Sequence, residues 1–144
     1  QDFELAIKMV EVNALSVLTC MTWVSTKRDV DWVIVLGSVA ADRGRRSNYL
    51  YGATKAVADT FISGALMNSD SPKWLLVKAG PVRSKMTKGL EENPLWAMPS
   101  DIARAIATRL NAGNAGTMYA PAHWSFIMRF IRILPSAILK RLPI

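Results

Sequence analysis

Several residue types are scarce in this 144-residue sequence, and each scarcity removes a class of structure. The single cysteine, Cys20, cannot form a disulfide within the chain, which fits a reducing compartment. Cys20 also falls in an apolar helical pattern, so we expect it to be a small buried hydrophobic side chain. The single histidine, His123, has no second ligand near it in the sequence, so we predict no metal site.

Long polar tracts, low-complexity segments and internal repeats are also missing, which argues against disorder and repeat architectures. Hydrophobic residues make up 51% of the chain and charged residues 20%, enough for one domain with a core. The sequence starts at Gln1 with a helical pattern and has no signal-peptide pattern. We interpret this as an internal start and expect a cytoplasmic protein.

Acidic residues are absent beyond Asp101, although the formal net charge of the whole chain is already +7. Six basic residues follow that point: Arg104, Arg109, Arg129, Arg132, Lys140 and Arg141. The C-terminal end is therefore positive and suits an anionic partner. The sequence has no recognised nucleic-acid motif, so we expect no nucleic acid. A non-catalytic module that binds an anionic partner remains an alternative.

Apolar periodicity predicts the first elements. Residues at helical spacing predict one long amphipathic helix over 3–24: Phe3, Ile7, Val10, Ala14, Val17, Leu18 and Met21. A polar turn over 27–29 leads to an apolar run over 32–36 that shows no alternation. Such a run indicates a strand covered on both faces, as in a parallel sheet.

The rest of the chain continues the alternation of helices and strands. We expect a loop over 42–48, a helix over 49–67, a strand over 74–77, an irregular flap over 82–99, a helix over 101–111 and a strand over 117–120. Ser100 is a good N-cap for the third helix. The alternation predicts a parallel α/β sheet with right-handed crossovers. Three strands correspond to one half of a doubly wound domain.

The sequence from 1 to 121 accounts for this half-domain, and 122–144 forms a helical tail. Polar residues recur along the tail at three- and four-residue intervals: Ser125, Arg129, Arg132, Ser136 and Lys140. Basic residues and Pro135 argue against a membrane span. A basic amphipathic segment in the headgroup region fits 123–144 better. A helix pair that packs on the domain or on a second subunit is the alternative.

Ser38, Tyr51 and Lys55 combine into a proton-transfer site in outline. Tyr51 and Lys55 are four residues apart, so on a helix they share a face. An ammonium beside a phenol favours the phenolate, which suits a general acid in carbonyl reduction or a base in alcohol oxidation. Ser38 follows a strand and could hydrogen-bond the same substrate oxygen. The hydride must come from a cofactor, because no side chain donates one.

On its own, a Tyr-x-x-x-Lys spacing is as well explained by an ordinary surface pair on a helix. Small residues after the tyrosine, Gly52-Ala53-Thr54, permit close approach of another segment and strengthen the functional interpretation. A second strand that ends at Gly80-Pro81 strengthens it further.

In combination, these motifs resemble the catalytic half of a short-chain dehydrogenase/reductase. The matching features are Ser38, the thirteen-residue step to Tyr51, the block Tyr51-Gly52-Ala53-Thr54-Lys55 and the strand and loop over 77–84. The resemblance covers nearly the whole chain and implies the C-terminal half of a Rossmann-like fold. It implies Tyr51 as the acid/base, Ser38 as the residue that orients the carbonyl, and Lys55 as a ligand of the nicotinamide ribose.

Further roles follow from the same resemblance. Asn13 matches the helix asparagine that holds a water in the proton relay of the family. Gly80 belongs to the loop that bounds the nicotinamide, and Val82 and Ser84 match the positions that hold its carboxamide. The implied cofactor is NAD(H) or NADP(H). In the family the helices that match 3–24 and 51–67 commonly form a dimer interface, which implies a homodimer of the full-length parent.

Two departures from the family pattern stand out. Ala79 replaces the usual proline of a Pro-Gly pair. More seriously, no glycine-rich phosphate loop follows a strand anywhere in the sequence. We therefore expect a truncated sequence that binds nicotinamide dinucleotide poorly or not at all.

The tail suggests a substrate class. Met118-Tyr119-Ala120-Pro121 and the segment over 124–135 are similar to the end of the decaprenyl-phosphoryl 2-keto-pentose reductases. Those enzymes use NADH or NADPH to reduce a keto sugar on a polyprenyl phosphate at the membrane surface. A basic tail suits a lipid-linked anionic substrate, which implies peripheral contact with the inner face of the cell membrane. A soluble ketone, steroid or acyl substrate is the alternative.

Overall fold

Three parallel strands form the centre of the molecule. A computed structural model describes residues 2–68, 72–89 and 94–141. The strands lie in the order β1 (Trp32–Ser38), β2 (Lys73–Ala79) and β3 (Gly116–Ala120). The register places Ser38 beside Ala79 and Ala79 beside Ala120, so the carboxyl ends of all three strands form one edge. The predicted parallel α/β sheet is confirmed.

A single helical rod precedes the sheet. It consists of α1 (Phe3–Val10), a π-helical turn (Glu11–Leu15) and α2 (Ser16–Ser25). The Asp2 carboxylate accepts hydrogen bonds from the first backbone N–H groups of α1, which caps the rod. The predicted long helix is confirmed, with a π-helical turn around Asn13 that periodicity does not reveal. Such turns occur often at functional sites.

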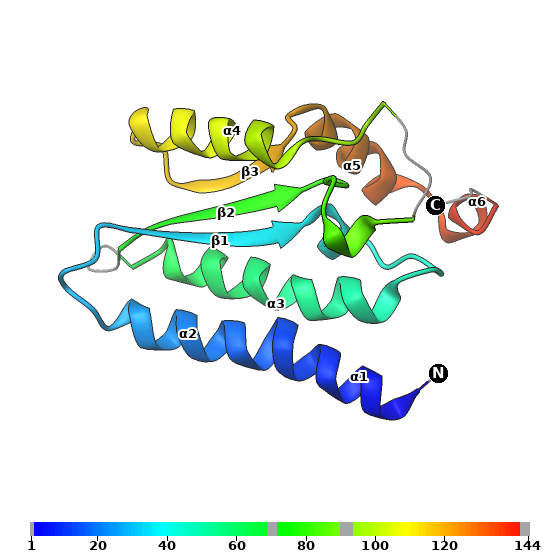
Figure 1. The fold of residues 1–144 in the computed structure, drawn as a ribbon, viewed down its shortest axis with the longest axis horizontal. Coiled ribbons are helices and arrows are strands. Elements are labelled where there is room, and N and C mark those ends of the chain that lie inside the picture. The colour runs from blue at the N-terminus through cyan, green and yellow to red at the C-terminus, as the bar shows by residue number, and fades with distance from the viewer. Residues whose placement is uncertain (1, 69–71, 90–93, 142–144) are drawn as a thin grey trace.

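The rod is long and apolar enough to cross a membrane by length and composition. A mostly buried core helix or a signal sequence passes the same test, and 11% of the 18-residue window that passes it here is buried. Here the rod lies along α3 (Tyr49–Ala65), and both cover one face of the sheet (Figure 1). Their shared core contains residues from α2, α3 and β2: Met21, Ala58, Ile62, Trp74 and Leu76.

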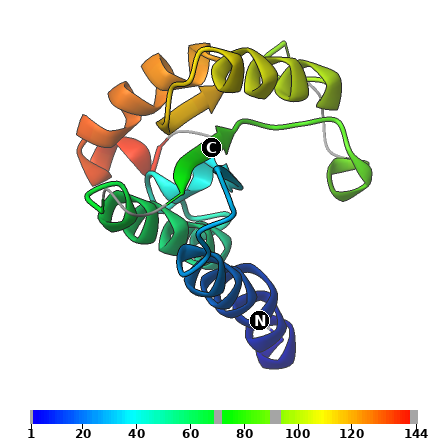
Figure 2. The same cartoon turned by 90° about the vertical axis from the view of Figure 1, so that its left-hand side faces the viewer.

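The opposite face of the sheet is covered by α4 (Pro99–Asn111), which packs over β2 and β3. Figure 2 shows the blue N-terminal rod and the yellow α4 on opposite sides of the strands. The core of this side contains Leu75, Val77, Ala97, Ile102 and Ala120. α4 starts at Pro99, with Met98 as its N-cap, so the predicted cap at Ser100 is wrong. The Asp101 carboxylate instead accepts a hydrogen bond from the Met98 N–H at 3.1 Å.

Strand β1 was expected to be covered on both faces, and in the structure it lies at an edge of the sheet with part of its surface exposed. Ile34 and Leu36 of this strand are 40% and 62% exposed. The prediction that both of its faces are covered is therefore wrong. An open apolar groove of about 460 Å³ runs between α2 and β1. Cys20 lines this groove and is exposed, so its predicted burial is wrong as well.

The segments directly after β2 and β3 lie next to the sheet as well. After β2, Val82 forms a bridge with Ala97, which brings the predicted flap back beside its own start; its residues 90–93 lie outside the described part. The tail forms α5 (His123–Ile133) and α6 (Ser136–Leu139), separated at Leu134 and Pro135. α5 packs through Trp124, Met128 and Ile131 against Val39.

Candidate active site

Ser38 is the last residue of β1 and starts a short 3₁₀ turn (Val39–Ala41). Its hydroxyl oxygen accepts a hydrogen bond from the Ala40 N–H at 3.1 Å. This bond fixes the serine at the carboxyl edge of the sheet. In open parallel α/β sheets, this edge is where ligands bind.

The first turn of α3 is packed directly on this 3₁₀ turn. Gly52 is buried, and a Cβ atom there would lie only 2.6 Å from the Ala40 carbonyl oxygen. The Thr54 side chain is also buried and donates a hydrogen bond to the Tyr51 carbonyl at 2.8 Å. The small residues after Tyr51 thus bring its helix against the segment that carries Ser38.

A pair of glycine variants in α3 tests this close approach. We expect Gly52→Ala to lower the free energy of unfolding by about 1–3 kcal/mol, because the new methyl group meets a backbone oxygen that cannot move freely. Gly64→Ala is the matched control, since no atom lies within 4 Å of its added Cβ. It should raise stability by about 0.5–1 kcal/mol. Urea unfolding measures both, and equal effects would contradict the packing argument.

Tyr51 and Lys55 lie one turn apart on α3, as the spacing predicts. The Lys55 ammonium nitrogen is 5.8 Å from the centroid of the Tyr51 ring. Partial burial of Lys55 lowers the pKa of its ammonium from the ordinary value, because the charged form loses water. A cation with little water around it acts more strongly on a neighbouring oxygen.

Asn13 lies in the π-helical turn of the rod and is half-buried. α3 packs against this turn, so Asn13 and Tyr51 come from two helices that lie side by side. The helix pair therefore brings the turn of Asn13 to the helix of Tyr51 and Lys55. Its role in a proton relay stays a prediction.

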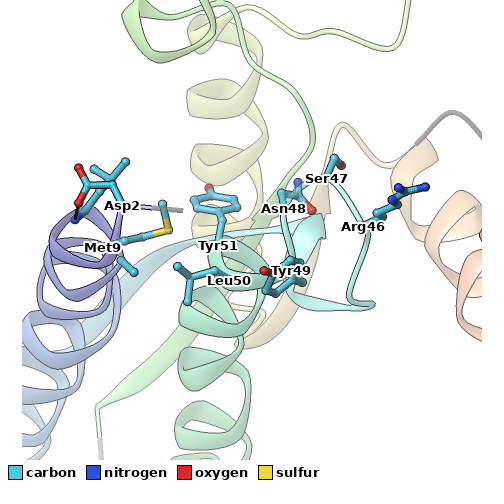
Figure 3. Close-up of a pocket in the computed structure, with 10 residues that line it drawn as sticks. Asp2, Met9, Arg46, Ser47, Asn48, Tyr49, Leu50 and Tyr51 are labelled. Atoms are coloured by element: carbon cyan, nitrogen blue, oxygen red, sulfur yellow. Dashed lines mark hydrogen bonds between the residues drawn. The ribbon is translucent and has the colours of Figure 1, made fainter.

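Tyr51 also borders a pocket of about 320 Å³ between α1 and the start of α3. Figure 3 shows Tyr51 with Met9 of α1 on one side and Asn48 of the preceding loop on the other. The side-chain oxygen of Asn48 is buried and has no hydrogen-bond partner within the described residues. Such an acceptor can bond a donor on a bound molecule.

The segment after β2 starts at the same edge of the sheet as Ser38. The Gly80 N–H donates to the Ala120 carbonyl at 3.0 Å, and a Cβ atom at Gly80 would lie 2.1 Å from the Trp124 indole nitrogen. This position therefore requires glycine. The indole nitrogen itself is buried without a partner in the part of the chain that the structure describes.

Thr87 holds the loop that contains Val82 and Ser84. Its hydroxyl donates to the Val82 carbonyl at 2.7 Å and accepts from the Ser84 N–H at 3.0 Å. The motif analysis missed Thr87. The pattern Ser-x-x-Thr at the start of a helical turn, which resembles a capping box, is the signal that could have found it.

A buried charge cluster lies just beyond Ser38. The Asp42 carboxylate is fully buried and is bonded by the Lys78 ammonium, by the Tyr119 hydroxyl at 2.6 Å and by Arg132 at 3.3 Å. Lys78 also forms an ion pair with Asp59 of α3 at 2.9 Å. The cluster thus joins the segment after β1 to strands β2 and β3 and to helices α3 and α5. Lys78, a charged residue inside the apolar strand β2, is the sequence signal that could have indicated a buried charge cluster.

Tyr119 serves this cluster as a hydrogen-bond donor. Burial and the bond to Asp42 raise the pKa of Tyr119 well above the ordinary range. Its hydroxyl therefore keeps its proton at neutral pH and donates a hydrogen bond to Asp42.

This chain is similar to several proteins of known sequence and to a solved structure. The sequence matches no family model. It is 34% identical over 115 residues to uncharacterized oxidoreductases of two Mycobacterium tuberculosis strains, covering 77% of this chain and 45% of each relative. It is 30% identical over 112 residues to an uncharacterized oxidoreductase of Streptomyces coelicolor, covering 76% of this chain and 44% of that protein. The chain therefore spans less than half the length of these relatives.

A solved structure shares the fold. It is a short-chain dehydrogenase from Burkholderia cenocepacia J2315 in complex with NADP, with a TM-score of 0.82 and 23% sequence identity. The similarity covers 100% of this chain and 61% of that one. The chain thus has the α/β fold seen in part of that enzyme. More narrowly, it has the fold of part of a short-chain dehydrogenase, and the predicted Rossmann-like fold class is confirmed.

Proposed function

We propose that the chain is the catalytic part of an NAD(P)-dependent short-chain dehydrogenase/reductase that reduces a keto group. One observation carries the proposal: the first turn of α3, with Tyr51, is packed through Gly52 onto the turn that follows Ser38. This packing supports the proposal because Ser38 ends a strand at the carboxyl edge of the sheet and Tyr51 and Lys55 belong to the helix packed there. The oxidoreductase names of the relatives support the same reaction class.

In this proposal each side chain has one task. The Ser38 hydroxyl donates a hydrogen bond to the substrate carbonyl oxygen and orients it. Tyr51 transfers its proton to that oxygen as negative charge develops there. The Lys55 ammonium stabilises the phenolate that remains, and its partial burial strengthens this effect. Asn13 holds a water through which Tyr51 regains its proton.

The cofactor in the proposal is NAD(H) or NADP(H). Lys55 and Tyr51 contact its ribose, and Gly80, Val82 and Ser84 bound its nicotinamide end. The loop of Val82 and Ser84 suits this task because the Thr87 hydroxyl fixes it. NADP in the Burkholderia structure supports the choice. When bound, the reduced cofactor supplies the hydride.

A calorimetric titration tests how much of the cofactor site this chain contains. We expect no micromolar binding of NADPH to the 144-residue chain, since the sequence has no glycine-rich turn for the pyrophosphate. Fusion of a dinucleotide-binding half that contains a glycine-rich turn to the N-terminus of this chain should restore micromolar binding of NADPH. Tight binding by the chain alone would show that the phosphates are held in another way.

The reaction itself is tested by ketone-dependent oxidation of NADPH in the fused polypeptide. Our specific candidate is a keto sugar on a polyprenyl phosphate, supported by the basic tail. Soluble ketones, steroids and acyl substrates form the comparison panel. Oxidation of NADPH with none of these compounds would contradict the reductase proposal, and activity confined to the soluble compounds would contradict the lipid-linked substrate.

We further propose a homodimer of the longer parent through the rod and α3. Large apolar side chains along the rod support this, because they are exposed in the single chain: Phe3, Leu5, Ile7, Val10, Val12 and Leu15. Sedimentation of the fused polypeptide should give a dimer. Peripheral contact of 123–144 with the inner face of the cell membrane completes the proposal.

A further inference from the structure

Helix α5 presents an apolar face to solvent. Phe126 and Phe130 are 77% and 61% exposed, and Ile133 is 75% exposed. These positions recur at intervals of four and three, so they share one side of the helix. Trp124, Met128 and Ile131 occupy the other side and are buried in the domain. We call the exposed side, with Arg129, the α5 outer face.

The α5 outer face cannot turn inward, because the helix is fixed at its C-terminal end. The Arg43 guanidinium donates to the carbonyls of Arg132 and Leu134 and to the Ser136 hydroxyl, at 3.2 to 3.3 Å. The Arg132 side chain itself is bonded to the buried Asp42. The exposed phenylalanines are therefore a stable feature of the surface.

The charged residues on α5 and after it are all basic. Arg129 is exposed and has no ion-pair partner in the described part of the chain. Lys140 and Arg141 follow in the tail, and no acidic residue occurs after Asp101. A hollow of about 330 Å³ beside the face is lined by Tyr119, Ser125, Phe126, Arg129 and Arg132. Two guanidinium groups and a hydroxyl suit a phosphate group there.

We infer that the α5 outer face binds the surface of an anionic membrane. Phe126, Phe130 and Ile133 enter the boundary between headgroups and acyl chains, while Arg129 and Arg132 contact lipid phosphates. Aromatic residues on one side and basic residues beside them are the composition of interfacial helices. This inference rests on the peripheral membrane contact proposed above for 123–144, and it adds which residues enter the membrane surface and which stay in the domain core.

Two other occupants fit the face less well. A second copy related by two-fold symmetry would bring the same basic face against itself, which like charges oppose. Further strands would pair with the backbone of an edge strand, β1 or β3, whereas the α5 outer face presents side chains of a helix. A membrane of anionic lipid supplies both the apolar and the negative partner.

Vesicle flotation of the intact chain tests the inference. One vesicle type contains phosphatidylglycerol and phosphatidylcholine in equal parts, and the other contains phosphatidylcholine alone. We expect binding to the anionic vesicles only, and we expect it to weaken at high salt. Phe126→Ser should lower the partition coefficient about tenfold. Arg129→Gln should lower it about fivefold.

Matched controls distinguish binding through the α5 outer face from nonspecific binding to vesicles. Met67→Ser removes an apolar side chain that is 85% exposed and lies just after α3, outside both α5 and the rod. Arg104→Gln removes an exposed charge from α4, one that is paired with Asp101 at 3.5 Å. Both controls should keep wild-type binding. Equal losses in test and control variants, equal binding to neutral vesicles, or no binding at all would overturn the inference.

Sedimentation of the same variants tests the competing occupant. If Phe126→Ser converts a dimer into a monomer while Met67→Ser does not, a second copy covers the face and the inference is wrong. Vesicle binding needs neither cofactor nor substrate. Its failure would therefore leave the reductase proposal intact, and a failed ketone assay would leave the membrane inference intact.

Discussion

Replacing Tyr51 with phenylalanine is expected to lower kcat about 10²–10⁴-fold in the polypeptide that includes an upstream dinucleotide-binding half. The variant keeps the aromatic ring and loses only the hydroxyl that transfers a proton to the carbonyl oxygen. The ring lies beside Lys55, and its helix is fixed by the contact between Gly52 and Ala40. The fold should therefore survive, and the loss should appear in kcat rather than in KM.

The assay is steady-state oxidation of NADPH with the ketone that proves active in the panel. Tyr49→Phe is the control, because it removes a hydroxyl from an exposed side chain in the same turn of α3. Its loss of kcat should be far smaller. A Tyr51→Phe enzyme with wild-type kcat would show that another group is the acid, and the Ser38, Tyr51 and Lys55 proposal would fail.

Local rules were sufficient for most of the fold and for the outline of the candidate site. Helical spacing placed Tyr51 and Lys55 on one face of α3, and the end of an apolar run placed Ser38 at the end of β1. Both features depend on residues a few positions apart. The strands proved longer than predicted because pairing extends them past the apolar residues, to Ser38 in β1 and Ala79 in β2.

Local patterns failed to predict which apolar residues lie on the surface. An apolar stripe looks the same whether it faces a core or a neighbouring chain, so Cys20, Ile34 and Leu36 were expected to be buried and are exposed. On α5 the same ambiguity hid the outer face with Phe126 and Phe130. Sequence patterns show that a residue prefers to leave water, and only the fold shows what covers it.

The buried charge cluster around Asp42 could not be predicted from the sequence for a different reason. Asp42 meets Tyr119 and Arg132 across 77 and 90 positions of the chain. No spacing rule connects residues so far apart. The contacts exist because a parallel sheet brings the carboxyl ends of its strands to one edge. Knowledge of the strand order is therefore required before such a cluster can be predicted.

Removing the carboxylate at the centre of that cluster is expected to destabilise the chain strongly. Asp42→Ala should lower the free energy of unfolding by about 3–5 kcal/mol, because breaking a buried ion pair leaves the partner charge uncompensated. Lys78 is buried in β2 and would keep only Asp59 as an anionic partner. The Tyr119 hydroxyl would lose its acceptor, at a further cost.

Urea unfolding of the 144-residue chain measures this loss, and Asp29→Ala provides the control. Asp29 is exposed in the loop before β1, so its removal should change stability by about 0.5 kcal/mol or less. Replacing Lys78 with methionine together with Asp42→Ala should cost less than the sum of the two single changes, because neither charge is then left alone. Additive losses would show that Asp42 and Lys78 stabilise the chain independently. Coupled losses would show that one ion pair joins the segment after Ser38 to the sheet.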